Sequence, residues 1–140
     1  MTILEIIALV KQWQSEGKKV VLGTGTFDAP THPGHVDFFE TIGGYGDKVI
    51  IGINSDKFTR DRKGPDRPIM NESGRMRVVA SNRNVDAVFV ALSGKRGLLK
   101  TLKPDVVVFN GTDTDKSYEK QQEEKLNNFK KEFPNINFVI

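Results

Sequence analysis

Five short apolar runs alternate with segments of helical periodicity, and this alternation constrains the fold more than any other feature of the chain. Strands that alternate with helices build a parallel sheet with right-handed crossovers. The run at 48–54 is apolar almost throughout, which is typical of a parallel strand covered on both faces. We therefore predict a doubly wound α/β protein with a five-stranded parallel sheet and helices on both faces. The predicted strands are residues 19–23, 48–54, 86–91, 105–109 and 135–140, the last of them edge-like.

The segments between these runs predict the helices. Residues 3–14 carry apolar side chains at i, i+3, i+4 and i+7, and Gly17 is a suitable residue to end that helix. A loop is predicted over 61–68, where glycine, proline and charged residues gather. Of the remaining predicted helices, the first ends at Ile42, and a short second one begins at Ser55 or Asp56 and reaches Phe58 or Arg60. The third runs from Asn71 to Asn82, with Met76, Val79 and Ala80 facing inward. The fourth contains Leu98, Leu99 and Leu102, and the fifth runs from Ser117 to Phe133.

The composition is that of an ordinary globular domain. The chain has 140 residues, of which 28% are charged and 37% apolar, so we expect one domain over 1–140 with an N-terminal helix, within residues 1–17, packed on it. It has no cysteine, which excludes disulfides and thiol catalysis and fits a reducing compartment. No basic leader is present and no apolar run approaches the roughly 18 residues of a membrane span. We expect a cytoplasmic protein that has no membrane partner.

The stretch from Gly23 to His35 is the candidate site. It lies between a predicted strand and a predicted helix, and open α/β sheets bind ligands outside the carboxyl ends of their strands. Glycines allow backbone N–H groups to approach an anion, and Pro33 suits a first helical turn, whose positive end attracts phosphate. His32 and His35 are the only histidines, and a spacing of three puts both rings on one side of a helix. We therefore predict a phosphate site with two imidazole donors.

Four other interpretations compete with a phosphate site for this stretch. A dinucleotide fingerprint requires a third glycine where Asp28 stands, and a P-loop requires Gly-Lys-Ser/Thr, so both fail. Two histidines suggest zinc, but no cysteine or third histidine completes such a site. Solvated loop histidines without a function remain open as the plainest alternative.

The residues 25–35, Gly-Thr-Phe-Asp-Ala-Pro-Thr-His-Pro-Gly-His, resemble the HxGH signature of the nucleotidyltransferase superfamily of cytidylyltransferase type. Later segments, among them 46–56, 63–68 and 84–86, are similar to the nucleotidyltransferase domain of ADP-heptose synthase, with glycerol-3-phosphate cytidylyltransferases and archaeal FAD synthases slightly further away. The resemblance implies a Rossmann-like fold. It also implies a reaction in which a nucleoside monophosphate passes from a nucleoside triphosphate, ATP or CTP, to a phosphorylated small molecule, with Mg²⁺ and release of pyrophosphate.

The resemblance also implies roles for individual residues. His32, His35 and Lys63 would be catalytic and would bind phosphates, with Lys63 in a mobile loop. Asp28 would orient the loop or lie near the metal, and a structural Asx-turn is the alternative. Arg75 would be a further anion ligand, although an ion pair on a helix surface is the alternative. The remaining implied nucleotide-binding residues are Gly25, Thr26, Phe27, Gly34, Asn110, Gly111 and Asp113.

The chain departs from the family pattern in two places. The lysine that often opens the turn at 110–113 is replaced by Asn110. The Ser/Thr-rich phosphate motif expected after the last strand is absent, since the sequence reaches Ile140 on that strand. Three explanations stay open: other residues supply this element, the sequence is incomplete, or activity is lost. In the last case the chain is a non-catalytic nucleotide-binding module, which is the alternative to the enzyme. Within the enzyme class, FMN adenylyltransfer is the runner-up.

The positive charge is unevenly distributed. The net charge is +3, but residues 57–83 alone contain eight basic and three acidic residues, a local net charge of +5. Nucleic acid is a poor candidate partner because only Phe58 is available there for stacking. A small polyanion fits better, and a merely solvated charged loop remains the alternative. A homodimer is also expected, from the resemblance and from the apolar N-terminal stripe.

Overall fold

A computed structural model describes residues 1–28, 32–109 and 116–139. Its elements are α1 (Ile3–Ser15), β1 (Val20–Gly25), α2 (Pro33–Gly43), β2 (Lys48–Asn54), α3 (Asp56–Lys63), α4 (Glu72–Ala80), β3 (Ala87–Ala91), α5 (Lys95–Leu102), β4 (Val106–Val108), α6 (Lys116–Glu132) and β5 (Asn137–Val139). No helix among these described segments is both long and apolar enough to cross a bilayer.

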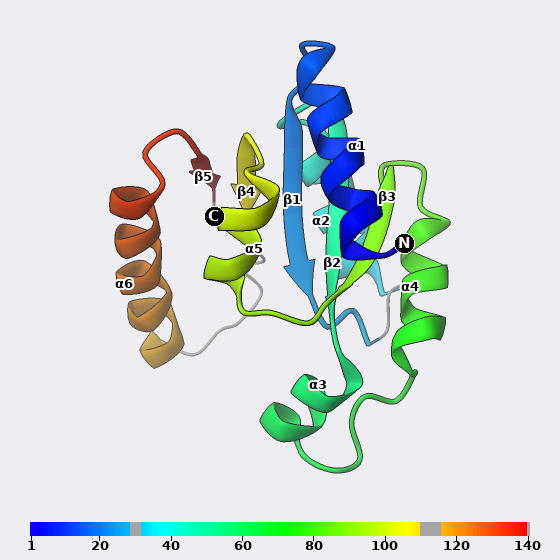
Figure 1. The fold of residues 1–140 in the computed structure, drawn as a ribbon. Helices are drawn as coiled ribbons and strands as arrows, with labels where there is room; N and C mark the ends of the chain where they lie inside the picture. The colour runs from blue at the N-terminus through cyan, green and yellow to red at the C-terminus, as the bar shows by residue number, and fades with distance from the viewer. Residues whose placement is uncertain (29–31, 110–115, 140) are drawn as a thin grey trace.

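The five strands form one sheet in the order β3-β2-β1-β4-β5, and all four neighbouring pairs are parallel (Figure 1). The strand order reverses between β1 and β4, which is the position where doubly wound sheets open a crevice for ligands. The prediction of a Rossmann-like α/β sheet with β5 at an edge is confirmed. So is the expectation that the reversal lies next to the first strand.

Helices cover both faces of the sheet because successive side chains of each strand point to opposite faces. Along β1, Val20 and Leu22 pack with α1, α5 and α6, whereas Val21 packs with α2 and α4. The two cores are separate apolar clusters on either side of one sheet. The carboxyl ends of the strands therefore lie between two helical layers.

The N-terminal helix α1 forms part of the first core. Thr2 and Glu5 form a reciprocal capping box at its start, and Gly17, with φ +77°, follows its end, as the sequence predicted. Ile6 and Val10 are buried, and the rest of the apolar stripe packs against the same core. The stripe is thus occupied within the chain, which removes one of the two reasons for expecting a homodimer.

Gly23 is a strand residue rather than a loop residue, which corrects the sequence-based expectation. A Cβ atom at this position would lie 2.6 Å from Ile42 Cδ1 and 3.2 Å from Ile51 Cδ1. Glycine is therefore favoured here because the side chains of Ile42 and Ile51 fill the space that a Cβ would take, and not because of an anion. Gly25 is likewise the last residue of β1.

Two other boundaries differ from prediction. The helix α3 continues through Lys63 and ends at Gly64 with φ +107°, so that 61–63 are helical instead of part of a loop. In α4, Val79 is buried as expected, but Ala80 is exposed, and Arg75 lies inside the protein. Figure 1 shows α3 beyond the carboxyl end of the sheet, set apart from the two helical layers.

Candidate active site

His32 is the N-cap of α2. Its backbone is extended (φ −61°, ψ 137°), and its Nδ1 accepts a hydrogen bond of 3.0 Å from the backbone N–H of Gly34. In a neutral imidazole whose Nδ1 accepts, the proton is on Nε2. The cap therefore fixes a tautomer in which Nε2–H can donate to a ligand.

His35 stands in the first turn of α2, half-buried, beside His32. The two ring centroids are 5.9 Å apart, which confirms that the spacing of three brings the rings to one side. The backbone N–H groups of this turn are already engaged, since Gly34 donates to the His32 ring and His35 and Val36 donate to the His32 carbonyl. Anion binding here consequently depends on the imidazole N–H groups and the helix dipole rather than on the backbone amides of Gly34 and His35.

Phe27 anchors the loop that precedes the histidines. It is 2% exposed, has φ +52°, and its ring packs edge-on to His35 at 5.4 Å between centroids. A Cβ at Gly25 would lie 2.9 Å from the Phe27 ring, so that glycine makes room for this anchor. The Phe27 side chain thus belongs to the core, and only its backbone is placed to meet a ligand.

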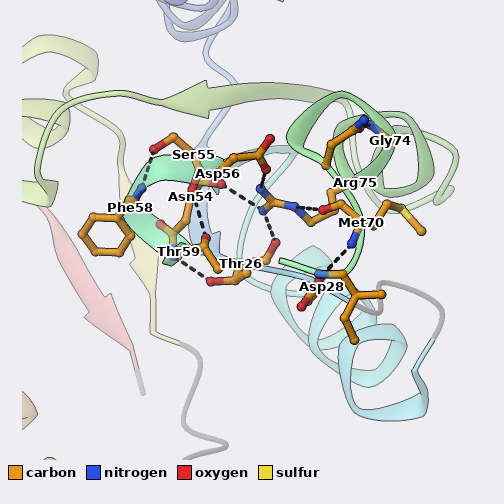
Figure 2. Close-up of polar contacts among 12 residues, drawn as sticks. Thr26, Asp28, Asn54, Ser55, Asp56, Phe58, Thr59, Met70, Gly74 and Arg75 are labelled. Atoms are coloured by element: carbon orange, nitrogen blue, oxygen red, sulfur yellow. Dashed lines mark hydrogen bonds and ion pairs between the residues drawn. The ribbon is translucent and has the colours of Figure 1, made fainter. Parts of the chain in front are cut away.

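Arg75 connects four segments at the carboxyl end of the sheet (Figure 2). Its side chain is fully buried, and its guanidinium donates to the carbonyls of Thr26 (2.6 Å), Asn54 (2.9 Å) and Met70 (2.9 Å) and to Asp56 Oδ1 (2.8 Å). It thereby fixes the ends of β1 and β2, the start of α3 and the start of α4 relative to one another.

This placement bears on both sequence-based interpretations of Arg75. It is not an ion pair on a helix surface, because its side chain is fully buried. Its role as a direct anion ligand stays a prediction, but four acceptors of the protein already occupy the guanidinium. A sequence signal existed: Arg75 and Val79 are four apart and so share the inward face of α4.

Thr26 and Asn54 join the two strand ends directly. Asn54 Nδ2 donates to the Thr26 hydroxyl at 3.0 Å, next to the carbonyls that Arg75 binds (Figure 2). The adjacent Ser55 caps α3 by accepting from the Phe58 N–H at 3.1 Å. The edge that would face a nucleotide is therefore built by polar contacts of adjacent strands.

Asp28 ties the loop after β1 to the segment before α4. Its Oδ1 accepts from the backbone N–H groups of Ile69 (2.8 Å) and Met70 (3.1 Å), and its Oδ2 lies 3.3 Å from Arg67. Burial acts to raise the pKa of Asp28, but the two backbone hydrogen bonds and Arg67 outweigh it and hold that pKa below its usual value. An Asx-turn would need an N–H at residue 30, which is proline, so the loop-orienting role fits and the turn does not.

The described residues contain no cluster of metal-ligating side chains. Among them, no group of three or more His, Cys, Asp or Glu could hold a metal ion. Both Asp28 oxygens accept from N–H donors, which does not suit a metal ligand. The metal role of Asp28 remains a prediction that this geometry does not favour.

Replacing Asp28 by asparagine should lower the free energy of unfolding by about 2 kcal/mol at neutral pH, the size expected for hydrogen bonds to a charged group. The pKa of Asp28 in the folded protein lies below the ordinary value of 3.8. The ionised carboxylate therefore stabilises the folded protein at pH values above 3.8, and this contribution is lost as the pH falls through the folded-state pKa. Urea unfolding of both proteins at neutral and acidic pH measures this. Asp37→Asn, on the exposed side of α2, should show neither effect.

Lys63 is the last residue of α3 and is exposed, without an ion-pair partner among the described residues. Its helix lies beyond the carboxyl end of the sheet (Figure 1), the side on which the histidines begin α2. Asn110, Gly111 and Asp113 lie outside the described residues, so their predicted roles stay predictions.

The parallel α/β fold and the two histidines at the carboxyl end of its sheet define a class of protein. Comparison with known proteins agrees with this class. The chain belongs to the cytidylyltransferase-like family, whose model matches residues 22–139. It is thus a nucleotidyltransferase, as the sequence resemblance indicated.

Individual relatives show more closely which members of this family the chain is similar to. The chain is 37% identical over 112 residues to the bifunctional protein HldE of Koribacter versatilis (79% of this chain, 23% of the relative). It is 39% identical over 104 residues to HldE of Azorhizobium caulinodans (72% and 21%). The chain spans less than a quarter of the length of these two relatives. A crystal structure of the lipopolysaccharide core biosynthesis protein from Thermoplasma volcanium GSS1 shares the fold, with a TM-score of 0.65, 21% identity and coverage of 88% of this chain and 95% of that one.

Proposed function

We propose that this chain transfers a nucleoside monophosphate from a nucleoside triphosphate to the phosphate of a small sugar or polyol phosphate, with release of pyrophosphate. The observation that carries the proposal is the pair of imidazoles at the start of α2, held beside the carboxyl end of β1 with the Nε2–H of His32 available to donate. The similarity to HldE proteins supports a sugar phosphate as acceptor.

In this reaction an acceptor phosphate oxygen attacks the α-phosphorus, and the bond from that phosphorus to the oxygen bridging to the β-phosphate breaks. The acceptor oxygen is already ionised near neutral pH, so no general base is needed. Positioning and stabilisation of charge then carry the rate. His32 and His35 would donate to triphosphate oxygens, while Arg75 and Asp28 hold the strand ends and loops in place. The nucleotide is proposed to arrive as its Mg²⁺ complex.

Pyrophosphate release tests the proposal. Each of the four nucleoside triphosphates is combined with a panel of phosphorylated acceptors, including hexose phosphates, glycerol 3-phosphate and FMN. Release that depends on both a triphosphate and a sugar or polyol phosphate supports the proposal. Release only with ATP and FMN replaces it by flavin adenylyltransfer, and nucleotide binding without release with any acceptor indicates a non-catalytic module.

We further propose that the end of α3 and the segment after it close over the triphosphate. Asp28 anchors this segment at Ile69 and Met70, and Gly64 permits rotation at its other end. A homodimer, a cytoplasmic location and a single domain over 1–140 remain proposals that rest on the family.

Replacing Lys63 by alanine should weaken nucleotide binding by about tenfold, the size of one charge-assisted contact, and should lower turnover. Binding to the wild type should weaken with added salt, because the attraction is between partly exposed charges. Calorimetric titration with Mg²⁺–nucleotide at two salt concentrations measures both. Lys130→Ala removes an exposed lysine of α6 and should change neither quantity; equal effects of the two substitutions would contradict the closing segment.

A further inference from the structure

The first turn of α5 places one lysine over the carboxyl end of β4. Lys95 begins this helix, and its Nζ lies 4.0 Å from the centroid of the Phe109 ring. Phe109 directly follows β4, which pairs with β1 along Val106–Val108. Lys95 thus lies at the carboxyl end of β4, one of the two strands at the reversal of strand order, where no local sequence motif indicates a function for it.

Lys95 and the two histidines approach this crevice from opposite faces of the sheet. The histidines belong to α2, which packs in the core containing Phe39 and Val79. Lys95 belongs to α5, whose leucines pack in the core containing Phe89 and Val107. A ligand seated across the carboxyl ends of β1 and β4 would meet cationic or N–H donors from both helical layers.

The surroundings of Lys95 gather positive charge. Burial lowers the pKa of Lys95 to about 8, with help from the positive charges of Lys125 on α6 and Arg62 on α3. None of the ion pairs among the described residues includes Lys95. Positive charges from two other helices thus act on Lys95, and an anion bound beside its ammonium group would be attracted by them as well.

We propose that Lys95 forms a second anion subsite, which binds the phosphate of the acceptor. This proposal rests on the proposed function. In-line displacement requires the attacking oxygen to lie opposite the leaving pyrophosphate. If the histidines bind the triphosphate from the α2 side of the sheet, Lys95 on the α5 side is placed to bind the attacking phosphate of the acceptor.

One test of this subsite needs no turnover. The wild-type protein is acylated with N-acetoxysuccinimide, a neutral reagent that attacks unprotonated amines, and the modified lysines are quantified by peptide mass spectrometry. Inorganic phosphate is the probe, at about twice its dissociation constant, and should slow acylation of Lys95 about threefold. Lys100, exposed on the same helix, is the control and should react at an unchanged rate. Equal protection of both lysines, or no protection of Lys95, would overturn the subsite.

The kinetic test separates the acceptor from the nucleotide. Lys95→Ala should raise KM for the acceptor about 10- to 100-fold, the range for one charge-assisted contact, and leave KM for the nucleotide unchanged. For the wild type, kcat/KM for the acceptor should fall as the pH rises through about 8, as Lys95 loses its proton. Lys95→Arg should restore binding and shift that fall to higher pH, because a guanidinium stays charged.

A raised KM for the nucleotide instead would overturn the assignment to the acceptor. The two tests also distinguish this proposal from the proposed function. Phosphate protection of Lys95 without any pyrophosphate release would retain the subsite and remove the transfer activity.

Discussion

Replacing His35 by alanine is expected to lower the rate of transfer by about 10²–10³-fold, the usual effect of removing one donor that stabilises charge in a transition state. The ring is one of only two imidazoles in the chain and lies 5.9 Å from the other. Its edge-on contact with Phe27 contributes modestly to packing, so the free energy of unfolding should fall by about 1 kcal/mol. Pyrophosphate release and urea unfolding measure the two effects separately.

Glu40→Ala is the matched control, because Glu40 is exposed on the same helix, more than one turn further along. It should leave the rate of transfer unchanged. If the His35 variant retains near-wild-type turnover, or if its loss of rate parallels a loss of folded protein, the catalytic assignment of His35 is wrong.

Replacing Arg75 by methionine should lower the free energy of unfolding by about 3 kcal/mol, because removal of one buried partner leaves the others uncompensated. Three backbone carbonyls and the Asp56 carboxylate would lose their donors together. Since these acceptors belong to the ends of two strands and to the starts of two helices, nucleotide affinity should fall as well. Denaturant unfolding and calorimetric titration with nucleotide measure the two quantities.

Two further variants identify the cause. Arg77→Met, on the exposed side of α4, should be nearly neutral. Arg75→Lys keeps a positive charge but loses the planar fork, and it should recover only part of the stability. Full recovery by lysine would show that charge alone matters, whereas lost nucleotide affinity with unchanged stability would favour the role of direct anion ligand.

The fold could be predicted from the sequence because its strands are buried on both faces. The second strand was predicted residue for residue, since its apolar run is bounded by Asp47 and Ser55. The edge strand was predicted to begin too early, at residue 135, because its start depends on the partner: within the described residues, β4 pairs with it along Val106–Val108. The predicted end at Ile140 lies outside the described residues. Strand ends at an edge are set by a neighbouring strand that local pattern does not describe.

The site could be predicted only in part. The spacing of His32 and His35 determined their proximity because both lie on one helical turn. Arg75 was harder, since its four acceptors come from residues 5 to 49 positions away in sequence. Lys95 was missed altogether, because nothing local to α5 indicates that its ammonium group lies against the Phe109 ring.

The absence of a side chain at Gly23 has a consequence for the evolution of this protein. At Gly23, the side chain of Ile42 from α2 packs where a Cβ atom would lie, and the two imidazoles stand at the N-cap and in the first turn of that same helix. The position of the two candidate side chains therefore depends on a residue inside the core. A change in packing at this one contact would move the imidazoles as well, so the interior and the candidate site of this protein cannot evolve independently.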